Sequence, residues 1–504
     1  MLKKIRLIVS LVLFGLITFY FLDFTGVFGT HSWLQRIQLV PALLSLSFII
    51  IAVLFLLTFL FGRIYCSSIC PMGVYQDIVG WIIRKMAKRK KRFKYTRPKT
   101  ILRWGTLGVT AIAFFAGFTV LLGILDPYSA YGKMVVNVFK PLYMAGNNLL
   151  ASAFNHFDNY MFYKVDASIL SISSLVIALL TLLIIGFIAS KYGRLWCNTI
   201  CPVGTLLGLV GRFSLFKVRI DEIKCNHCGV CATKCKASCI NSSEQSIDYT
   251  RCVDCFDCIG ECRQHALSYN LRVKKVDHST DSSKRNFLIA GAITASVVPK
   301  VFADAQAVVA NANGLKSDKR KTPITPPGSI SRAHFQNKCT SCHLCVSKCP
   351  SHVLKPSFME YGLEGFMQPT VYFEKGFCNF DCTVCSDVCP NGAILPLTKE
   401  KKHLTQMGQV VFIMENCIVY REDTSCGACS EHCPTQAISM VPYKGGLTIP
   451  HVNTAICVGC GGCEYVCPAR PYRAVHIEGD VIQQKAKPFV EKKEEHIKVD
   501  NFGF

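Results

Sequence analysis

The chain has 504 residues, of which half are hydrophobic and only 18% are charged, and its mean hydropathy is +0.31. This composition excludes disorder as the dominant state, is unusual for a soluble globular protein, and predicts membrane-spanning segments. The formal net charge is +23, and the odd, very high count of 29 cysteines favours metal or cluster ligation over a disulfide framework.

Four apolar runs are long enough to cross a bilayer, because about twenty apolar residues in a helix cover the hydrocarbon core. They are residues 7–28, 39–61, 104–125 and 169–189. Eleven Lys and Arg residues fall between Arg84 and Arg103, after the second run. The positive-inside rule therefore predicts that both ends of this four-helix unit are cytoplasmic. Because the basic block flanks a membrane segment and contains few aromatics, nucleic-acid binding is not expected.

An internal repeat lies at an offset of 131 residues. Residues 62–80 and 193–211 are identical at nine of nineteen positions, and each copy contains the motif Cys-x3-Cys-Pro. A spacing of four residues places both sulfurs on one helical face, and the proline discourages continuation of the helix. Pseudo-symmetry between the copies can therefore bring four thiols together at the cytoplasmic surface. The four are Cys66, Cys70, Cys197 and Cys201.

Three interpretations fit these four repeated thiols: a further cluster or metal site, a pair of redox-active dithiols, or a purely structural motif. Arg63 and Arg194 stand three residues before the first cysteine of each copy and would offset the negative charge of thiolates. Spacing alone does not decide between the three, since a Cys-x3-Cys pair is a weaker signature than a four-cysteine motif.

Six cysteine quartets follow the repeat. The spacing C-x2-C-x2-C-x3-C supplies three thiolates for one [4Fe–4S] cluster and lends the fourth to a neighbouring cluster. Zinc ribbons lack this run, so we predict six [4Fe–4S] clusters. The regular quartets are Cys225, Cys228, Cys231, Cys235; Cys252, Cys255, Cys258, Cys262; Cys339, Cys342, Cys345, Cys349; and Cys457, Cys460, Cys463, Cys467. Two quartets have a stretched first interval, namely Cys378, Cys382, Cys385, Cys389 and Cys417, Cys426, Cys429, Cys433. Together with the repeated thiols, the quartets use every cysteine except Cys239.

Crossed ligation within the first pair of quartets predicts two four-cysteine sets. One is Cys225, Cys228, Cys231 and Cys262, and the other is Cys252, Cys255, Cys258 and Cys235. The proline that usually follows the fourth cysteine is replaced here by Lys236 and Arg263, whereas the last four quartets keep it. The pairing of those last four remains open. Residues 339–343 also fit the C-x-x-C-H haem motif, but a quartet already requires both thiols, so haem is not expected.

Residues 282–306 separate the two groups of quartets and resemble an export signal, with a basic start, an apolar stretch and small residues at a cleavage-like site. Lys284 to Leu288 resemble a twin-arginine motif with Lys in the first position. A short fifth membrane crossing is favoured over a cleaved signal or an interfacial helix. Such a crossing would make the last four clusters periplasmic.

These motifs carry a family resemblance. Residues 1–275 resemble the NapH-type membrane ferredoxins in their four helices, two Cys-x3-Cys-Pro motifs, Asp126-Pro127 and two cluster motifs, and residues 282–480 resemble the exported NapG/MauM-type four-cluster ferredoxins. The chain thus looks like a fusion of the two. The resemblance implies electron transfer from membrane quinol to a periplasmic oxidoreductase or cytochrome, within a multi-subunit complex of the bacterial inner membrane. It does not identify the terminal acceptor.

We therefore expect an α-helical membrane bundle that carries ferredoxin-like α+β modules. The expected boundaries are 1–216 for the four-helix unit, 217–275 for a two-cluster module, 276–328 for the crossing segment and linker, 329–485 for a four-cluster module and 486–504 for a polar tail. No catalytic residue or separate substrate site is expected beyond electron transfer as part of a quinol dehydrogenase. Candidates for a proton relay on the periplasmic side are Asp23, His31, Asp126 and His156.

Two other functions remain open from the sequence. The chain could be a maturation or metal-handling factor that works through the four repeated thiols, or a relay subunit in which electrons flow in the opposite direction. The preferred function also has a difficulty, because the first two clusters are expected in the cytoplasm and the last four across the membrane. The sequence contains no haem pair that would connect them.

Overall fold

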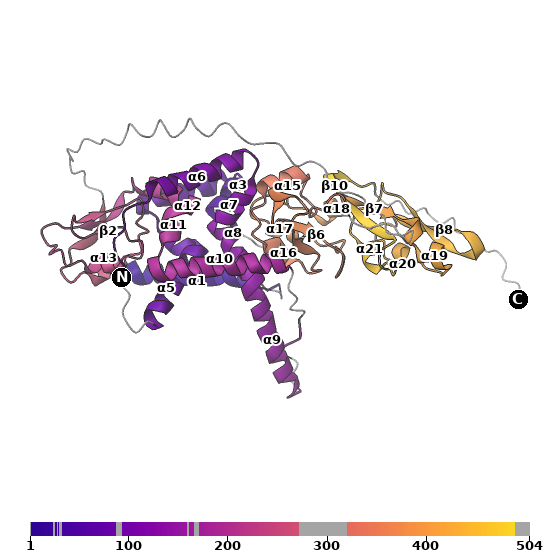
Figure 1. Ribbon diagram of the computed structural model, residues 1–504, viewed down its shortest axis with the longest axis horizontal. Helices are drawn as coiled ribbons and strands as arrows, with labels where there is room; N and C mark the ends of the chain where they lie inside the picture. The colour runs from indigo at the N-terminus through magenta and orange to yellow at the C-terminus, as the bar shows by residue number, and fades with distance from the viewer. Residues whose placement is uncertain are drawn as a thin grey trace.

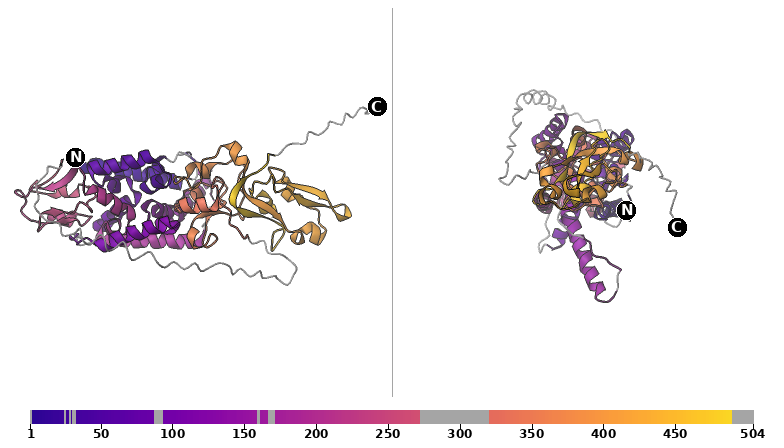
Figure 2. Two further views of the ribbon diagram at one scale, coloured as in Figure 1. Left: turned by 90° about the horizontal axis from the view of Figure 1, so that it is seen from above. Right: turned by 90° about the vertical axis from the view of Figure 1, so that its right-hand side faces the viewer.

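The computed structural model describes residues 2–23, 26–27, 29, 33–86, 93–158, 161–165, 171–271 and 320–488. In this part of the chain, a helical unit lies between two smaller modules along the long axis (Figures 1 and 2). The first module begins at Phe216 and the second at Arg320. The export-like segment, residues 282–306, lies outside the described residues.

Two long helices frame the helical unit, α1 (Leu2–Leu22) and α10 (Ile172–Tyr192), and both are long and apolar enough to cross a membrane. The other two apolar runs are each broken into two helices, whereas the sequence predicted one continuous span for each. One forms α3 (Leu39–Leu44) and α4 (Phe48–Phe61), and the other forms α6 (Thr100–Phe115) and α7 (Thr119–Leu125). The breaks coincide with Leu46, at φ 56°, and Gly117, at φ 86°, since a left-handed residue ends a helix.

Shorter helices complete the helical unit. The helix α8 (Pro127–Met134) is buried along its whole length. Asp126 caps it by accepting a hydrogen bond from the Ser129 amide at 2.8 Å, and Pro127 suits the first turn because that turn needs no intrahelical donor. The other elements are α2 (Trp33–Arg36), the π-helix η1 (Tyr65–Ile69), α5 (Pro71–Met86), the π-helix η2 (Val135–Phe139), α9 (Lys140–Asn155), α11 (Leu195–Thr199) and α12 (Pro202–Gly211).

The first module is a small α+β unit. Strand β1 (Phe216–Ile220) pairs antiparallel with β4 (Leu267–Leu271), and β2 (Ile240–Asn241) pairs with β3 (Ser246–Ile247). One short helix lies in each quartet, namely α13 (Val230–Lys234) and α14 (Asp257–Glu261). The fourth cysteine of each quartet is the C-cap of its helix, so the helix direction fixes where that thiol points.

The second module repeats this plan on a larger scale. Its three antiparallel pairs are β5 (Leu354–Pro356) with β6 (Pro369–Val371), β7 (Thr405–Phe412) with β10 (Val475–Lys485), and β8 (Ile438–Pro442) with β9 (Thr448–Val452). Its helices are α15 (Arg332–Lys338), α16 (Leu344–Lys348), α17 (Val384–Val388), α18 (Lys399–His403), α19 (Ile418–Glu422), α20 (Ala428–Glu431) and α21 (Gly462–Val466), with 3-10 turns η4 (Leu363–Gly365), η5 (Met414–Asn416) and η6 (Lys444–Gly446).

A single buried apolar cluster runs through all three parts of the molecule. It includes Val218 and Phe256 of the first module, Tyr128 of the helical unit, and Leu344 and Val388 of the second module. A separate core, which contains Phe335, Phe373 and Val410, fills the second module further from the helical unit. The three parts are therefore packed against one another.

Candidate cluster sites and the four-thiol centre

Two cavities inside the first module are lined by four-cysteine sets. The cavity of about 430 Å³ is lined by Cys225, Cys228, Cys231 and Cys262. The cavity of about 360 Å³ is lined by Cys235, Cys252, Cys255 and Cys258, and also by Cys239. Each set takes three thiols from one quartet and one from the other, which is the crossed arrangement predicted from the spacing. Four thiols around one cavity fit a [4Fe–4S] cluster.

The last four quartets also pair by exchanging their fourth cysteines. One cavity is lined by Cys349 with Cys378, Cys382 and Cys385, and another by Cys467 with Cys417, Cys426 and Cys429. Burial raises the pKa of Cys345, and the thiolates of Cys342, Cys339 and Cys389 raise it further. Burial likewise raises the pKa of Cys463, and the thiolates of Cys460, Cys457 and Cys433 raise it further. The structure thus pairs the first quartet of this module with the second, and the third with the fourth.

Cys239, which no quartet uses, is close to one of these sets. Its Sγ atom lies 3.5 Å from Sγ of Cys235, and both residues line the same cavity. The motif spacing gave no sign of this fifth thiol, because Cys239 comes after the fourth cysteine of its quartet.

The four repeated thiols come together inside the helical unit. Each of the four residues is only 2–4% exposed. Burial raises the pKa of Cys201, and the thiolates of Cys197, Cys70 and Cys66 raise it further, as expected when several thiols share one buried site. We call this set the four-thiol centre. Within the described part of the chain, no three His, Cys, Asp or Glu side chains are close enough to hold a single metal ion.

Two glycines hold the two halves of the centre in matching conformations. A Cβ atom on Gly73 would lie 2.2 Å from the Cys66 carbonyl oxygen, and one on Gly204 would lie 2.0 Å from that of Cys197. Only glycine permits this approach of α5 to η1, and of α12 to α11. The repeat therefore conserves its Cys-Pro-x-Gly sequence for a steric reason that is the same in both copies.

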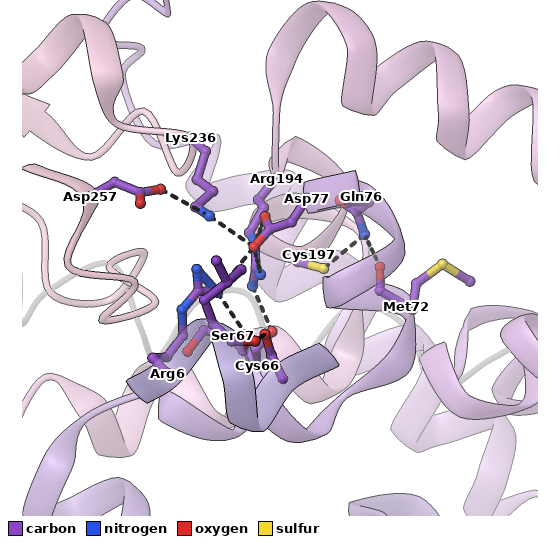
Figure 3. Close-up of polar contacts among 12 residues, drawn as sticks. Arg6, Cys66, Ser67, Met72, Gln76, Asp77, Arg194, Cys197, Lys236 and Asp257 are labelled. Carbon is purple, nitrogen blue, oxygen red and sulfur yellow. Dashed lines mark hydrogen bonds and ion pairs between the residues drawn. The ribbon is translucent and has the colours of Figure 1, made fainter. Parts of the chain in front are cut away.

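Polar donors face the four-thiol centre, and Figure 3 shows Gln76 beside Cys197 and Arg194 beside Cys66. The Gln76 amide donates to Sγ of Cys197 at 3.1 Å, and Nη2 of Arg63 donates to Sγ of Cys66 at 3.7 Å. Arg194 donates to the carbonyl oxygen of Cys66 at 2.6 Å. The side chains of Arg63 and Arg194 are fully buried, so their charges act on the thiols at low dielectric.

Asp77 forms ion pairs with three cations beside the four-thiol centre. Its carboxylate lies 2.7 Å from Nη2 of Arg194, 2.8 Å from Nζ of Lys236 and 3.2 Å from Nη1 of Arg6. Burial opposes ionisation, but Arg194 and Lys236 hold the pKa of Asp77 well below its usual range. Lys236 also pairs with Asp257 at 3.0 Å. Arg6, Arg194 and Lys236 therefore share two carboxylates, those of Asp77 and Asp257.

The first module docks on the Gly-Arg pair at the start of each repeat. The Arg63 amide donates to Asp254 at 2.9 Å, and the Arg194 amide donates to the Lys236 carbonyl at 2.8 Å. The preceding Gly62 and Gly193 have φ values of 77° and 63°, and a Cβ on either would clash with the same docking partner. Lys236 thus occupies the position of the missing proline because its backbone and side chain both bind the helical unit.

The second module docks at the opposite end, on α8. Ser129 Oγ lies 2.7 Å from Thr340 Oγ1, and a Cβ on Gly132 would lie 2.5 Å from the Cys342 carbonyl oxygen. His343 accepts from the Asn137 amide at Nδ1 (3.1 Å) and donates from Nε2 to the Met367 carbonyl (2.9 Å). The histidine of the haem-like motif therefore fixes a cluster loop to the helical unit.

The four proton-relay candidates have different surroundings. Asp23 pairs with Lys348 at 2.6 Å, so it belongs to the docking surface. Asp126 is buried, and burial raises its pKa to about 6. His156 is exposed at the C-terminal end of α9, and His31 lies outside the described residues. Asp126 therefore combines burial with a pKa of about 6.

Comparison with known protein families decides the class of the chain. Residues 43–92 and 172–221 match a family model described as a 4Fe–4S binding domain, and residues 319–394 and 424–470 match models described as 4Fe–4S dicluster domains. The chain is an iron–sulfur electron-transfer protein of the ferredoxin type. Within each of the first two matched segments, the only cysteines are those of one Cys-x3-Cys-Pro motif.

The ferredoxin-type chain is distantly similar to known proteins over about a third of its length. It is 29% identical to the ferredoxin-type protein NapF of Escherichia coli over 159 residues, which are 32% of this chain and 88% of NapF. It is 34% identical to the methylamine utilization ferredoxin-type protein MauM of Methylobacillus flagellatus and 32% identical to NapG of Escherichia coli, over 29% of this chain in each case and 64% and 65% of those proteins. No solved structure matches the chain.

Proposed function

We propose that this ferredoxin-type protein carries electrons from membrane quinol through its helical unit to a redox partner on the other side of the membrane. The observation that carries the proposal is the docking of two cluster modules at opposite ends of one helical unit, with a continuous buried core between them. Bound [4Fe–4S] clusters supply the one-electron carriers, and the quartets provide ligands for six of them.

The outer surface of the helical unit supports a position within a bilayer. Large apolar side chains are exposed on four of its helices, for example Ile8 on α1 (63%), Ile49 on α4 (81%), Ile101 on α6 (90%) and Leu183 on α10 (62%). Contiguous apolar exposure on this scale marks a surface that contacts lipid or another protein. In this proposal α1, α10 and the two broken runs form a four-helix membrane bundle.

The helix α9 and the basic block support an orientation. In Figure 1, α9 leaves the body at a steep angle to α1 and α10 near the second module, and it exposes Leu142, Leu149 and Leu150. A helix that lies in the membrane interface has such an apolar face. The basic block between Arg84 and Arg103 favours a cytoplasmic first module. The second module then faces the periplasm, where an oxidoreductase or cytochrome would accept its electrons.

Burial of the four-thiol centre speaks against the alternative of metal handling. A thiol that receives or delivers a metal ion must be reached by its donor or acceptor, whereas these four residues are 2–4% exposed. They also lie between two buried arginines, which would repel an incoming cation. The centre is therefore better suited to a permanent electron carrier than to metal exchange.

The test is anaerobic reduction of the purified, oxidised protein by a menaquinol analogue, followed by cluster absorbance. We expect rapid bleaching in the wild type, slower bleaching in Asp126→Asn because this buried carboxyl would accept a proton from quinol, and unchanged bleaching in His156→Ala. If clusters that dithionite still reduces do not bleach with quinol, quinol is not the donor and the proposal fails.

A further inference from the structure

The four-thiol centre has a ligand set that the separate repeats do not have. Each copy of the Cys-x3-Cys-Pro motif supplies two thiols, which is half of what a cubane cluster needs. The structure brings Cys66 and Cys70 together with Cys197 and Cys201 in one buried site, where Nη2 of Arg63 lies 3.7 Å from Sγ of Cys66 and 3.5 Å from the Cys197 carbonyl oxygen, with a matching glycine behind each half.

The charges around the centre complement an anionic group. Four thiolates give an oxidised [4Fe–4S] cluster a net negative charge. Facing it are the buried cations Arg63 and Arg194, with Arg6 and Lys236 one step further out. The carboxylates beside these cations are Asp77, Asp257 on Lys236 and Asp254 on the Arg63 amide. The Arg63 guanidinium donates to Asn198, to the Thr250 carbonyl and to Cys66, so a negative group at the thiols would complement its buried charge. Neutral thiols would not provide one.

The sulfurs also receive hydrogen bonds in the way that cluster ligands do. Gln76 donates to Cys197, Arg63 donates to Cys66, and the Gly204 amide donates to Cys201 at 3.4 Å. Such hydrogen bonds stabilise thiolate and tune cluster potential. The pseudo-symmetric counterpart of Gln76 is Leu207, so the repeat has placed a polar side chain on one half only.

The centre lies between the two cluster modules. The buried apolar core that contains Cys66, Cys70 and Cys201 extends into the first module, where it includes Cys235, Cys255 and Cys258. The same core extends into the second module, where it includes Cys342. Asp126 acts on both Cys70 and Cys342, since after burial it is among the groups that raise the pKa of each thiol. Because electron tunnelling slows steeply with distance, a carrier at this point would connect the modules.

We infer that Cys66, Cys70, Cys197 and Cys201 together ligate one iron–sulfur cluster inside the helical unit, and that this seventh centre relays electrons between the two modules. The relay role rests on the proposed function, whereas the ligation does not. Each step moves one electron, so that the donor cluster is oxidised by one electron and the acceptor cluster reduced by one. No bond to the protein changes and no proton is required.

The first test measures iron and acid-labile sulfide per chain in the anaerobically purified, full-length protein. The variant Cys70→Ser/Cys201→Ser should contain about four fewer irons per chain than the wild type and should lose one signal from the EPR spectrum of the reduced protein. The control is Ser68→Ala, which changes a buried residue of η1, the π-helix that also contains Cys66. This variant should keep the iron content of the wild type. Equal iron in the double variant and the wild type would overturn the inference.

A second variant covers the case in which the cysteine variant does not fold. Gln76→Leu introduces the residue that the other repeat already has at this position, so it should fold and keep the wild-type iron content. Loss of the hydrogen bond to Cys197 should lower the midpoint potential of one cluster in an EPR-monitored redox titration and leave the others unchanged. A titration identical to that of the wild type would show that Cys197 ligates no cluster.

The relay is tested separately from the quinol donor. Protein is inserted into vesicles that contain trapped cytochrome c, and a membrane-impermeant reductant is added outside. The wild type should reduce the trapped cytochrome, whereas Cys70→Ser/Cys201→Ser should do so at least ten times more slowly while its module clusters stay intact. Iron loss without a slower transfer would overturn the relay. Failure of quinol bleaching alone would overturn the proposed function and leave the ligation standing.

Discussion

The Nζ atom of Lys236 lies 2.8 Å from Oδ2 of Asp77, and this ion pair joins the first module to the helical unit directly beside the four-thiol centre. Lys236 follows Cys235, a predicted cluster ligand, and Asp77 lies one turn after Gly73 in α5. A residue that would be proline in a free-standing ferredoxin is therefore a docking residue here. The ion pair couples the position of one cluster loop to that of the repeated thiols.

Removing the charge of Asp77 should release the first module. Asp77→Asn leaves Arg194 buried without its counter-charge and removes one of the two carboxylates that pair with Lys236, and breaking a buried ion pair in this way costs about 3–5 kcal/mol. We expect faster proteolytic cleavage between the helical unit and the first module, and a lower unfolding temperature. Asp221→Asn removes an exposed pair with Lys224 and is the control, since surface pairs contribute about 0–1 kcal/mol. Equal effects of the two substitutions would contradict the docking role.

The cysteine spacing predicted the crossed grouping of cysteines around the two cavities of the first module, because that motif carries its geometry locally. The pairing of the last four quartets needed the structure, since any neighbouring quartet can supply a fourth thiol. The breaks at Leu46 and Gly117 were missed because apolar composition continues across both. The docking roles of Lys236 and His343 depend on residues more than 100 positions away in the chain, and no local pattern encodes such contacts.

Substitution of the two repeat glycines should disrupt the four-thiol centre. A methyl group at Gly73 or Gly204 would overlap the carbonyl oxygen of Cys66 or Cys197, and overpacking of this kind costs about 1–3 kcal/mol. We expect Gly73→Ala to unfold at a lower temperature and to lose the iron that the centre is proposed to hold. Gly146→Ala places the same methyl group on a helix where nothing lies within 4 Å, and helix propensity should make it neutral or stabilising. A Gly73→Ala protein as stable as Gly146→Ala would contradict the steric argument.

His343 should make the docking of the second module sensitive to pH. Burial lowers the pKa of His343 to about 3, so the folded protein keeps the imidazole neutral while the unfolded chain takes up a proton below its ordinary value of about 6.5. The contribution of His343 to the free energy of unfolding is therefore fully present above about pH 6.5. It decreases as the pH falls, by about 1.4 kcal/mol between pH 7.5 and pH 5.5.

The measurement for His343 is thermal unfolding at these two pH values. His343→Gln should show a smaller difference between them than the wild type, because its side chain does not titrate. His451→Gln replaces an exposed histidine of β9 and should retain the wild-type difference. If His343→Gln kept that difference as well, the pH sensitivity would arise elsewhere.

Cys239 should rescue the loss of its neighbour. The Sγ atoms of Cys239 and Cys235 are 3.5 Å apart and face the same cavity, so a small movement of the 235–239 turn would replace one ligand by the other. We expect Cys235→Ala to keep the iron content of the wild type and to shift the EPR signal of one cluster. The double variant Cys235→Ala/Cys239→Ala should lose iron.

The pseudo-symmetric position provides the control for this rescue. Cys262 is the fourth cysteine that lines the other cavity in the first module, and no fifth cysteine lines that cavity. Cys262→Ala should therefore lose iron as a single substitution, because no spare thiolate can complete the four ligands that the cluster needs. If Cys235→Ala lost as much iron as Cys262→Ala, then Cys239 would be a packing residue and not a reserve ligand.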